Sequence, residues 1–364
     1  MKKYNYIILL IGLVCMACQP NAKRGNGQSA IGNATGFAIE QYGDSMQLTI
    51  YSPWKKGEVM QKLVIGNGQL ARGERREAKG EGIERVVCTS ATHIGFISEL
   101  GIKDKVVGVS RPDRIYNLTD EERQRMVDIG DDFQPKMEAL LLCKPDLVII
   151  SSYMEGDALP QQIKAFGIPV ICCNEWMETT PLARAEWIRM FGVIFECLPQ
   201  ADSIFASVKD AYEAMRREGD EARGKSIMSG MSWRGTWYVP AGGTFMGQLF
   251  KDAGAAYRYA DNPSTSSIPL NIEQVIQEFA DADVWVGADV HTLAELKAMD
   301  EKHTWFKAYQ TGQVYHYLKR TLPSGANDFW ESGVVHPERI LQDLQQVLHG
   351  DTIGLYYIDP LKVL

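Results

Sequence analysis

Short apolar runs alternate with segments of helical periodicity over most of the chain. In the first half, four such runs carry the unbroken apolar and β-branched residues that are typical of strands covered on both faces. They are Val86–Thr89, Val106–Val109, Asp146–Ile150 and Ile168–Cys172. Because helical segments separate these runs, the pattern predicts a parallel sheet in an α/β lobe.

A leading hairpin and a long connecting helix complete the first part of the pattern. Gly36–Trp54 alternates loosely around the turn signal Gly43-Asp44, which predicts a β-hairpin. The polar stretch Asn67–Glu81 predicts a surface connection. Farther on, the segment 200–217 carries one apolar stripe, which indicates a long amphipathic helix. The stripe consists of Ile204, Phe205, Val208, Tyr212 and Met215.

A second α/β set follows the long helix. We expect strands at Ser226–Ser232, Thr236–Pro240, Asp283–Val286 and Val314–Leu318, and helices at Met246–Ala253, Ile272–Ala280, Leu293–Met299 and Pro337–Leu348. The predicted fold class is therefore α/β, with two Rossmann-like lobes joined by one long helix and a ligand cleft between the lobes. The expected bounds are 36–195 for the N-terminal lobe with its leading hairpin, 196–222 for the connecting helix and 223–364 for the C-terminal lobe.

The N-terminus has the pattern of an export signal. Lys2 and Lys3 precede an apolar run over residues 6–14, which is too short to span a bilayer. The run ends in Cys15-Met-Ala-Cys18, which resembles a bacterial lipobox, so residues 1–17 are expected to be removed and Cys18 to be lipidated. An ordinary signal peptide cut near Ala17 is the alternative. Residues 18–35 have few large apolar side chains and are expected to form a flexible tether.

The charge of the chain argues against a nucleic-acid binding protein, and its cysteine content argues against a disulfide scaffold. The chain has 38 Lys+Arg against 46 Asp+Glu, a net charge of −8, whereas nucleic-acid binding requires a basic face. Five cysteines remain beyond the leader, and four of them lie in or beside apolar stretches. An odd number without a spacing pattern indicates free thiols, with one bridge still open in an oxidising compartment.

The order of several motifs resembles a known family. Arg85–Gly101 with Lys105–Ser110, Ile129–Val148 ending in Lys-Pro-Asp-Leu-Val, and Ile163–Val170 lie in the first lobe, and Leu249–Ala255, Ile272–Ile276 with Ala282–Val284, and Ala308–Tyr315 lie in the second. Together they resemble the class III, helical-backbone substrate-binding lipoproteins of ABC importers, which serve as ferric-siderophore, haem and cobalamin receptors. The stretch Asn327–Gly333 is similar to a segment found in part of that family.

This resemblance implies a receptor without catalytic activity. Its ligand would be an iron-siderophore, haem or cobalamin-type molecule, which carries its own iron or cobalt, so no intrinsic cofactor is expected. The protein would be a monomer, held at the membrane by its lipid on the periplasmic side, and would deliver its ligand to an inner-membrane ABC permease. Because a continuous helix resists bending, we expect limited closure of the cleft.

In open α/β sheets, ligands bind beyond the carboxyl ends of the strands, and this argument selects the candidate residues. In the first lobe they are Thr92, His93, Arg111, Arg114, Tyr153 and Trp176. Arginine forks suit anionic oxygens and aromatic faces suit large flat ligands. His93 would contact ligand or metal, or else only pack or cap a helix, with Thr92 as a possible N-cap. Arg111 and Arg114 have the alternative of pairing with Asp113 on the surface.

The second lobe contributes Trp233, Arg234, Trp237, Arg320 and Trp330 as ligand candidates, whereas Trp285, between two valines, is expected in the core. Glu138 lies where the family carries an acidic residue that contacts the permease, with a plain helix-start glutamate as the alternative. The matching position in the second lobe is Gly243, which departs from the family pattern.

Two rival functions remain open at this point. A receptor for bare Zn²⁺ or Mn²⁺ needs converging histidines and carboxylates, and only His93 and His291 fall at strand ends. A chelatase-like enzyme would use His93 as a proton acceptor or metal ligand. The chain has no GxSxG, HExxH or P-loop motif.

Overall fold

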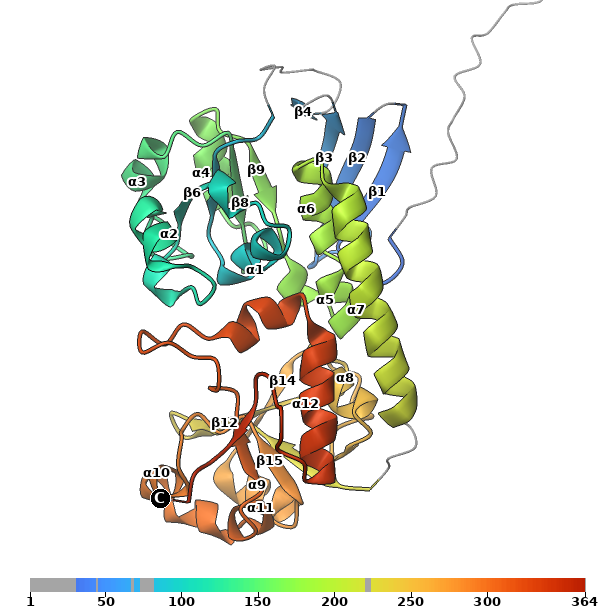
Figure 1. The fold of residues 1–364 in the computed structure, drawn as a ribbon, viewed down its shortest axis with the longest axis vertical. Coiled ribbons are helices and arrows are strands. Elements are labelled where there is room, and N and C mark those ends of the chain that lie inside the picture. Colours follow the sequence, from blue (N-terminus) through green and yellow to red (C-terminus); the bar gives the residue numbers. More distant parts are fainter. Residues whose placement is uncertain (1–30, 44, 67–68, 73–81, 220–223, 364) are drawn as a thin grey trace, which may run out of the picture.

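Two α/β lobes lie one above the other, and the helix α7 (Leu198–Gly219) runs along one side of both (Figure 1). The computed structural model describes residues 31–43, 45–66, 69–72, 82–219 and 224–363. The predicted class, two α/β lobes with one long connecting helix, is confirmed. The leader and Cys18, on which the export and lipidation predictions depend, lie outside the described residues.

The N-terminal lobe contains a five-stranded parallel sheet in the order β7-β6-β5-β8-β9. Its strands are β5 (Val86–Cys88), β6 (Val106–Val109), β7 (Val127–Asp128), β8 (Leu147–Ile150) and β9 (Val170–Cys172). The helices are α1 (Ala91–Glu99), α2 (Asp120–Arg125), α3 (Met137–Leu142) and α4 (Leu159–Ala165). Gly108 is required in β6, since a Cβ there would lie 2.7 Å from the sulfur of Cys143.

A second, antiparallel sheet precedes this lobe, with β1 (Phe37–Tyr42), β2 (Ser45–Tyr51), β3 (Val59–Gly66) and β4 (Gln69–Arg72) in chain order. The expected hairpin is thus only its first half, and β4 lies in the stretch that the sequence assigned to a surface connection. Gln61 of β3 joins the two sheets. Its amide donates to the carbonyl of Val170 and accepts from the N–H of Cys172, both at 2.8 Å.

Two buried glutamates hold the segment before β1. Glu186 accepts the N–H groups of Gly32, Asn33 and Ala34 at 2.7–3.1 Å, and Glu178 accepts those of Thr35 and Gly36 at 2.9 and 2.8 Å. The structured body therefore includes residues that the sequence prediction assigned to the flexible tether. Charge-assisted hydrogen bonds of this kind are stronger than neutral ones, so this attachment is firm.

Helix α7 belongs to both hydrophobic cores. Phe205 and Val208 are buried in the core of the N-terminal lobe, whereas Tyr212, one turn farther on, is buried in that of the C-terminal lobe. The helix follows α5 (Pro181–Ala185) and α6 (Ile188–Ile194). Because the predicted apolar stripe packs against both lobes, α7 is a shared structural element and not a free linker.

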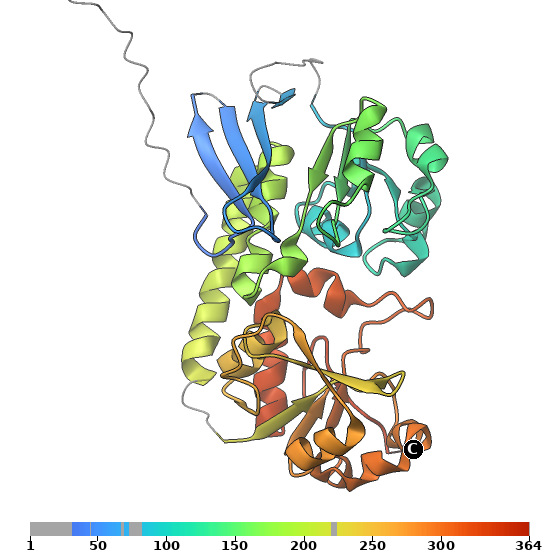
Figure 2. The same ribbon diagram turned by 180° about the vertical axis from the view of Figure 1, so that it is seen from behind.

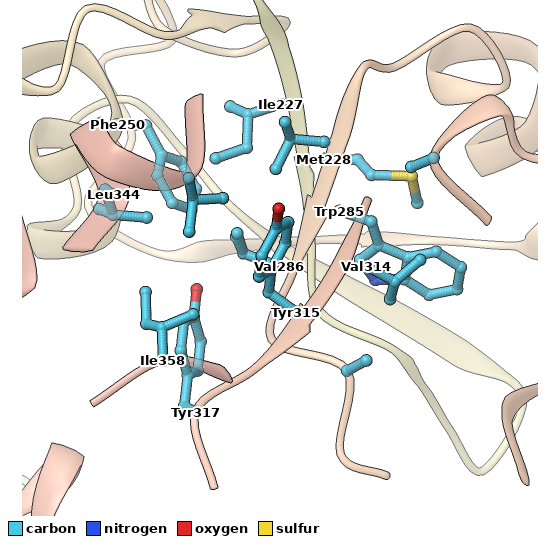
Figure 3. Packing of buried hydrophobic residues seen from close by; sticks show 14 of the residues in the cluster. Ile227, Met228, Phe250, Trp285, Val286, Val314, Tyr315, Tyr317, Leu344 and Ile358 are labelled. Atoms are coloured by element: carbon cyan, nitrogen blue, oxygen red, sulfur yellow. The ribbon is translucent and has the colours of Figure 1, made fainter. Parts of the chain in front are cut away.

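The C-terminal lobe contains a sheet in the order β13-β10-β15-β16-β17, parallel except at β17. Its strands are β13 (Ala256–Tyr257), β10 (Ser226–Ser229), β15 (Val284–Val286), β16 (Val314–His316) and β17 (Asp359–Pro360). The helices are α8 (Phe245–Asp252), α9 (Ile272–Phe279), α10 (Leu293–Met299), α11 (Lys307–Gln310) and α12 (Pro337–His349). Figure 3 shows Val286 and Tyr315 of this sheet on the same side as Phe250 of α8, with Trp285 and Val314 on the other side.

One of the strands predicted for the second lobe does not belong to its main sheet. Thr236–Pro240 is β12, which pairs with β11 (Ser232–Trp233) and β14 (Ser267–Leu270) in a small antiparallel sheet of its own (Figure 2). Trp237 of β12 is 1% exposed, its ring centroid lies 5.4 Å from that of Trp285, and its indole N–H donates to the carbonyl of Ser229. The expectation that Trp237 lines the cleft is therefore wrong, whereas the core position of Trp285 is confirmed.

The two lobes are joined a second time, away from α7. Glu331 accepts the backbone N–H groups of Tyr116 and Asn117 at 2.7 and 3.0 Å, and Asp328 accepts the side-chain amide of Asn117 at 2.7 Å. Val334 and Val335, three and four residues after Glu331, are buried in the core of the N-terminal lobe. A segment of the C-terminal lobe is thus inserted into its neighbour, an arrangement that the sequence did not indicate.

All five cysteines in the described part of the chain are free thiols: Cys88, Cys143, Cys172, Cys173 and Cys197. Burial raises the pKa of Cys172 to about 12, so this thiol stays protonated at neutral pH. The prediction of free thiols is confirmed.

The inserted segment predicts a pH-dependent stability. His336 lies 3.0 Å from Glu99 of α1 and 2.8 Å from Glu338. Burial alone would lower the pKa of His336, but hydrogen bonds with these carboxylates outweigh it and raise the pKa to about 9. The resulting stabilisation is fully present below about pH 6.5 and is lost as the pH rises through 9; it amounts to roughly 3 kcal/mol at most.

Thermal unfolding between pH 6 and 9.5 measures this effect. His336→Gln should remove most of the loss of stability that the wild type shows above pH 7. His349→Gln, at the exposed C-terminal end of α12, should leave the loss of stability above pH 7 unchanged. Equal pH profiles for the wild type and His336→Gln would contradict the assignment.

Because Trp237 is buried and Trp233 is exposed, replacing each by alanine should lower the free energy of unfolding by different amounts. Trp237→Ala removes a fully buried ring and should lower the free energy of unfolding by roughly 3–5 kcal/mol. Trp233 is 61% exposed, so Trp233→Ala should change it by less than about 0.5 kcal/mol. Urea denaturation followed by circular dichroism distinguishes the two, and equal costs would contradict this description of the core.

Candidate ligand-binding cleft

Three aromatic side chains form a cluster at the carboxyl ends of the strands of the N-terminal lobe. The ring of Tyr153, after β8, stacks 5.6 Å from that of Trp176, after β9, and lies 4.3 Å from that of Phe133, beyond β7. The Tyr153 hydroxyl donates to Asp132 at 3.1 Å, which fixes the ring. Trp176 and Phe133 are exposed, so the cluster of Phe133, Tyr153 and Trp176 offers an apolar wall to a ligand.

Phe133 was not among the candidates from the sequence. It follows β7, a two-residue edge strand whose side chains are both exposed, so no apolar run marks the strand. The argument from strand ends would have selected Phe133 had that strand been recognised. Tyr153 and Trp176, which follow strongly apolar strands, were found.

Two arginines lie beside this wall, after β6. Arg111 and Arg114 are both about half exposed, and each lies 3.8 Å from Asp113. Arg111 adopts a left-handed conformation with φ of 48°, an uncommon one for a residue other than glycine. Arg114 also lies against Gly325 of the opposite lobe, since a Cβ there would come within 2.5 Å of its guanidinium. Both arginines are accessible, and both also have the surface pairing that the sequence left open.

The C-terminal lobe has a cavity of about 360 Å³ at the carboxyl ends of β10, β15 and β16. Tyr238, Tyr317 and Trp330 supply its aromatic lining, and Asp289 is the one carboxylate among its lining residues. Trp330 is half exposed and packs edge-on against Phe329 at 4.6 Å. The volume lies in the range of small-molecule sites, which are about 300–1,000 Å³. The cavity therefore has room for part of a bulky ligand.

A hairpin tip carries the remaining candidates of this lobe. Trp233 ends β11, and the guanidinium of Arg234 lies 4.5 Å above its ring. Arg234 and Gly235 have φ of 51° and 84°, as a two-residue turn of the I′ type requires. Trp233 and Arg234 form an exposed pair outside the cavity lining, ready to contact a large molecule but not enclosed.

His93 does not lie at the cleft surface that the sequence predicted, and the half-buried Thr92 is not the N-cap of α1. His93 is fully buried, and its Nε2 lies 3.3 Å from the hydroxyl of Ser151. Burial lowers the pKa of His93 to about 3, only partly offset by the backbone of Cys173, so the ring is neutral. The N-cap of α1 is Ser90 and not Thr92, because the Ser90 hydroxyl accepts the N–H of Thr92.

Arg320 lies at the junction between the lobes, where other residues of the protein hold its side chain. Its Nε donates to buried Asp328 at 2.6 Å, and its guanidinium lies over the rings of Tyr116 and Tyr356 at 5.0 and 4.5 Å. Since Tyr116 belongs to the N-terminal lobe, this cation–π contact bridges the two lobes. The guanidinium of Arg320 is thus held by an ion pair and two aromatic rings within the protein, which differs from the free ligand contact expected from its position after β16.

Solved structures share this architecture. A haem-binding protein from a Roseiflexus species is 20% identical, with a TM-score of 0.59 over 74% of this chain and 99% of that one. A catecholate-siderophore binding protein from Vibrio cholerae is 16% identical, with a TM-score of 0.58 over 82% and 99%. The vitamin B12 binding protein of V. cholerae is 16% identical, with a TM-score of 0.54 over 73% and 97%. At these identities the likeness concerns the fold.

A curated relative is an uncharacterized lipoprotein of Methanocaldococcus jannaschii, 23% identical over 280 residues, which is 74% of this chain and 66% of the relative. The chain thus spans slightly less than two thirds of the length of that relative. Within the described residues, no helix has both the length and the hydropathy to cross a bilayer.

A family model settles the class of protein. The model described as periplasmic binding protein matches residues 86–321, which include most of both lobes and all of α7. This family consists of binding proteins and not of enzymes, which supports the expected absence of catalysis and removes the chelatase-like alternative. The protein therefore belongs to the periplasmic binding protein family.

Proposed function

We propose that this protein is the substrate-binding lipoprotein of an ABC importer, and that it captures a metal chelate or tetrapyrrole between its lobes. The observation that carries the proposal is the placement of aromatic side chains on both lobes at one junction. The cavity of the C-terminal lobe includes Asn327 and Trp330, and Asp328 and Glu331 beside them bind the loop that follows β6 of the other lobe. The strand ends of both sheets therefore meet at the same place.

The side chains at this junction suit a large, partly flat ligand. The cluster of Phe133, Tyr153 and Trp176 supplies one wall, and Tyr238 and Trp330 supply the other. An iron-siderophore, haem or cobalamin-type molecule has the size and the apolar faces for such a site. Arg111, Arg114 and Arg234 would contact its carboxylate, propionate or catecholate oxygens. Iron or cobalt would arrive with the ligand, and the protein would need no cofactor of its own.

The double connection between the lobes supports a small motion on binding. Helix α7 packs into both cores, and Val334 and Val335 anchor the C-terminal lobe in the N-terminal core. Opening the cleft widely would break the hydrogen bonds from Tyr116 and Asn117 to Glu331 and expose these valines. A preformed cleft that moves little keeps the entropic cost of binding low.

Delivery requires a permease, and we infer that Glu138 contacts it. Glu138 is exposed near the start of α3, available for an arginine of a membrane partner. At Gly243, the matching position in the second lobe, a Cβ would lie 2.7 Å from the carbonyl oxygens of Pro263 and Ser264. No side chain fits there, so the second lobe would dock through another residue. Lipidation at Cys18 would hold the monomer at the membrane on the periplasmic side.

The rival receptor for bare Zn²⁺ or Mn²⁺ has less support. His291 and His316 lie with their rings 5.0 Å apart, but they do not belong to a group of three or more metal-type ligands in the described residues. The group that does meet this condition includes His93 and is completely buried. A transport site must exchange its cargo, which a buried group does not readily do.

Titration of the purified protein with haemin, cyanocobalamin and a panel of ferric siderophores tests the proposal. Because Trp176 and Trp330 are exposed in the two walls of the proposed cleft, their fluorescence should change on binding. We expect saturable 1:1 binding of one class and recovery of the ligand unchanged. Failure of all three classes to bind, or chemical conversion of a bound tetrapyrrole, would contradict the function.

Single substitutions then test the walls of the cleft. Trp176→Ala and Trp330→Ala should each weaken binding of the ligand by ~1–3 kcal/mol, or roughly 5- to 150-fold, because an aromatic anchor is lost. Trp305→Ala is the matched control, since Trp305 is 55% exposed in a short helix (Glu301–Trp305) between α10 and α11. Calorimetry with unchanged affinity in both cleft variants would remove these residues from the site.

A further inference from the structure

We propose that His93, Cys173 and Glu175 form a binding site for one divalent cation of the zinc type, buried beneath the aromatic wall of the N-terminal lobe. The site is distinct from the cleft and does not depend on the proposed function. Its three residues come from two elements: His93 from the first turn of α1, and Cys173 and Glu175 from the loop and short helix (Glu175–Met177) after β9.

The donor atoms already lie close together. One ligand atom of each residue lies within 4.8 Å of the other two, and the Cys173 sulfur is 3.4 Å from Oε2 of Glu175. In a tetrahedral zinc site the bond lengths place neighbouring donors roughly 3.5 Å apart. The three side chains would therefore move inward by about 1 Å or less. Three protein ligands leave one tetrahedral position for a small molecule such as water.

The histidine is oriented as a metal ligand would be. Nε2 of His93 lies 3.3 Å from the hydroxyl of Ser151, whereas Nδ1 makes no well-formed hydrogen bond although it is fully buried. Imidazole ligands of metals commonly use one ring nitrogen for the ion and the other for a neighbouring polar group. A buried polar atom without a partner costs free energy, and a bound cation would remove that cost.

The Glu175 carboxylate is held with one oxygen facing the sulfur of Cys173. Oε1 of Glu175 lies 3.9 Å from the guanidinium of Arg184, and the hydroxyl of Thr92 also bonds this carboxylate. Oε2 is therefore left to face the thiol of Cys173. Thiolate, imidazole and carboxylate together match the preferences of Zn²⁺, whereas Mg²⁺ and Ca²⁺ require mainly oxygen ligands. Cation binding would displace the proton of the Cys173 thiol, which leaves to solvent.

A cation at this site would join α1 to the loop that carries Trp176. Trp176 directly follows Glu175 and stacks on Tyr153. Metal binding would therefore stabilise the N-terminal lobe and restrict the aromatic wall, before any ligand enters the cleft.

Titration with Co²⁺, a spectroscopic substitute for Zn²⁺, tests the site. The protein is first dialysed against a chelator under reducing conditions. We expect one Co²⁺ per chain, a near-ultraviolet band from sulfur-to-cobalt charge transfer, and a higher midpoint of thermal unfolding. Zn²⁺ should displace Co²⁺ stoichiometrically. Cys173→Ser should abolish the band, whereas Cys172→Ser should keep it, because Cys172 is the adjacent thiol and points into a different part of the core.

Alkylation of the wild type in moderate urea gives a second readout should Cys173→Ser fold poorly. Zn²⁺ should lower the labelling of Cys173, as measured by mass spectrometry, by a larger factor than that of Cys172, because only Cys173 binds the ion and Cys172 gains only from the stabilisation of the lobe. His93→Gln and Glu175→Gln should each weaken Co²⁺ binding at least tenfold. Co²⁺ binding without a thiolate band, the same band in Cys173→Ser, or an equal Zn²⁺-dependent fall in the labelling of both cysteines would overturn the proposal.

Discussion

The relative position of the two lobes depends on carboxylates that are buried where the lobes meet. Asp328 and Glu331, both 1% exposed or less, receive two backbone N–H groups and one amide from the loop after β6. Burial raises the pKa of Glu331 to about 7, against the lowering effect of those N–H groups, so the site is costly unless its hydrogen bonds stay intact. The need to keep these hydrogen bonds fixes how the two lobes meet. It therefore also fixes the relative position of the aromatic walls on either side of the junction.

The regular part of the fold follows directly from the apolar pattern. Strands β5, β8 and β15 are buried at every position, so their sequences are continuously apolar and easily recognised. Helix α7 shows its stripe because one face is buried along its length. The strands of the small and leading sheets were harder to assign, since a sheet with one exposed face needs only alternation. The strand β12 shows such alternation, with Trp237 and Val239 buried and Tyr238 exposed between them.

The alternation of buried and exposed side chains in β12 also explains why Trp237 was wrongly expected in the cleft. Selecting residues by position after a strand finds the right edge of the sheet but not the direction of a side chain. Tyr153 and Trp176 keep exposed ring surface at that edge, whereas His93, in the first turn of α1, is fully buried. Arg320 has the expected position, but its guanidinium is held by Asp328, a partner eight residues away that no local pattern indicates. Such long-range pairings are set by tertiary contacts and therefore cannot be read from periodicity.

The glutamates that hold residues 32–36 also determine how the body is presented to its surroundings. Glu178 precedes α5 and Glu186 caps its end, and α5 and α6 lie on the side of the molecule where α7 runs, with α3 on the opposite side (Figure 1). If Cys18 carries the proposed lipid anchor, the anchor would join the described part of the chain at Ile31, on the side of α5, α6 and α7. Force applied at that point would then act on the side where α7 packs into both cores, and would not act directly on the loops at the strand ends that line the proposed cleft.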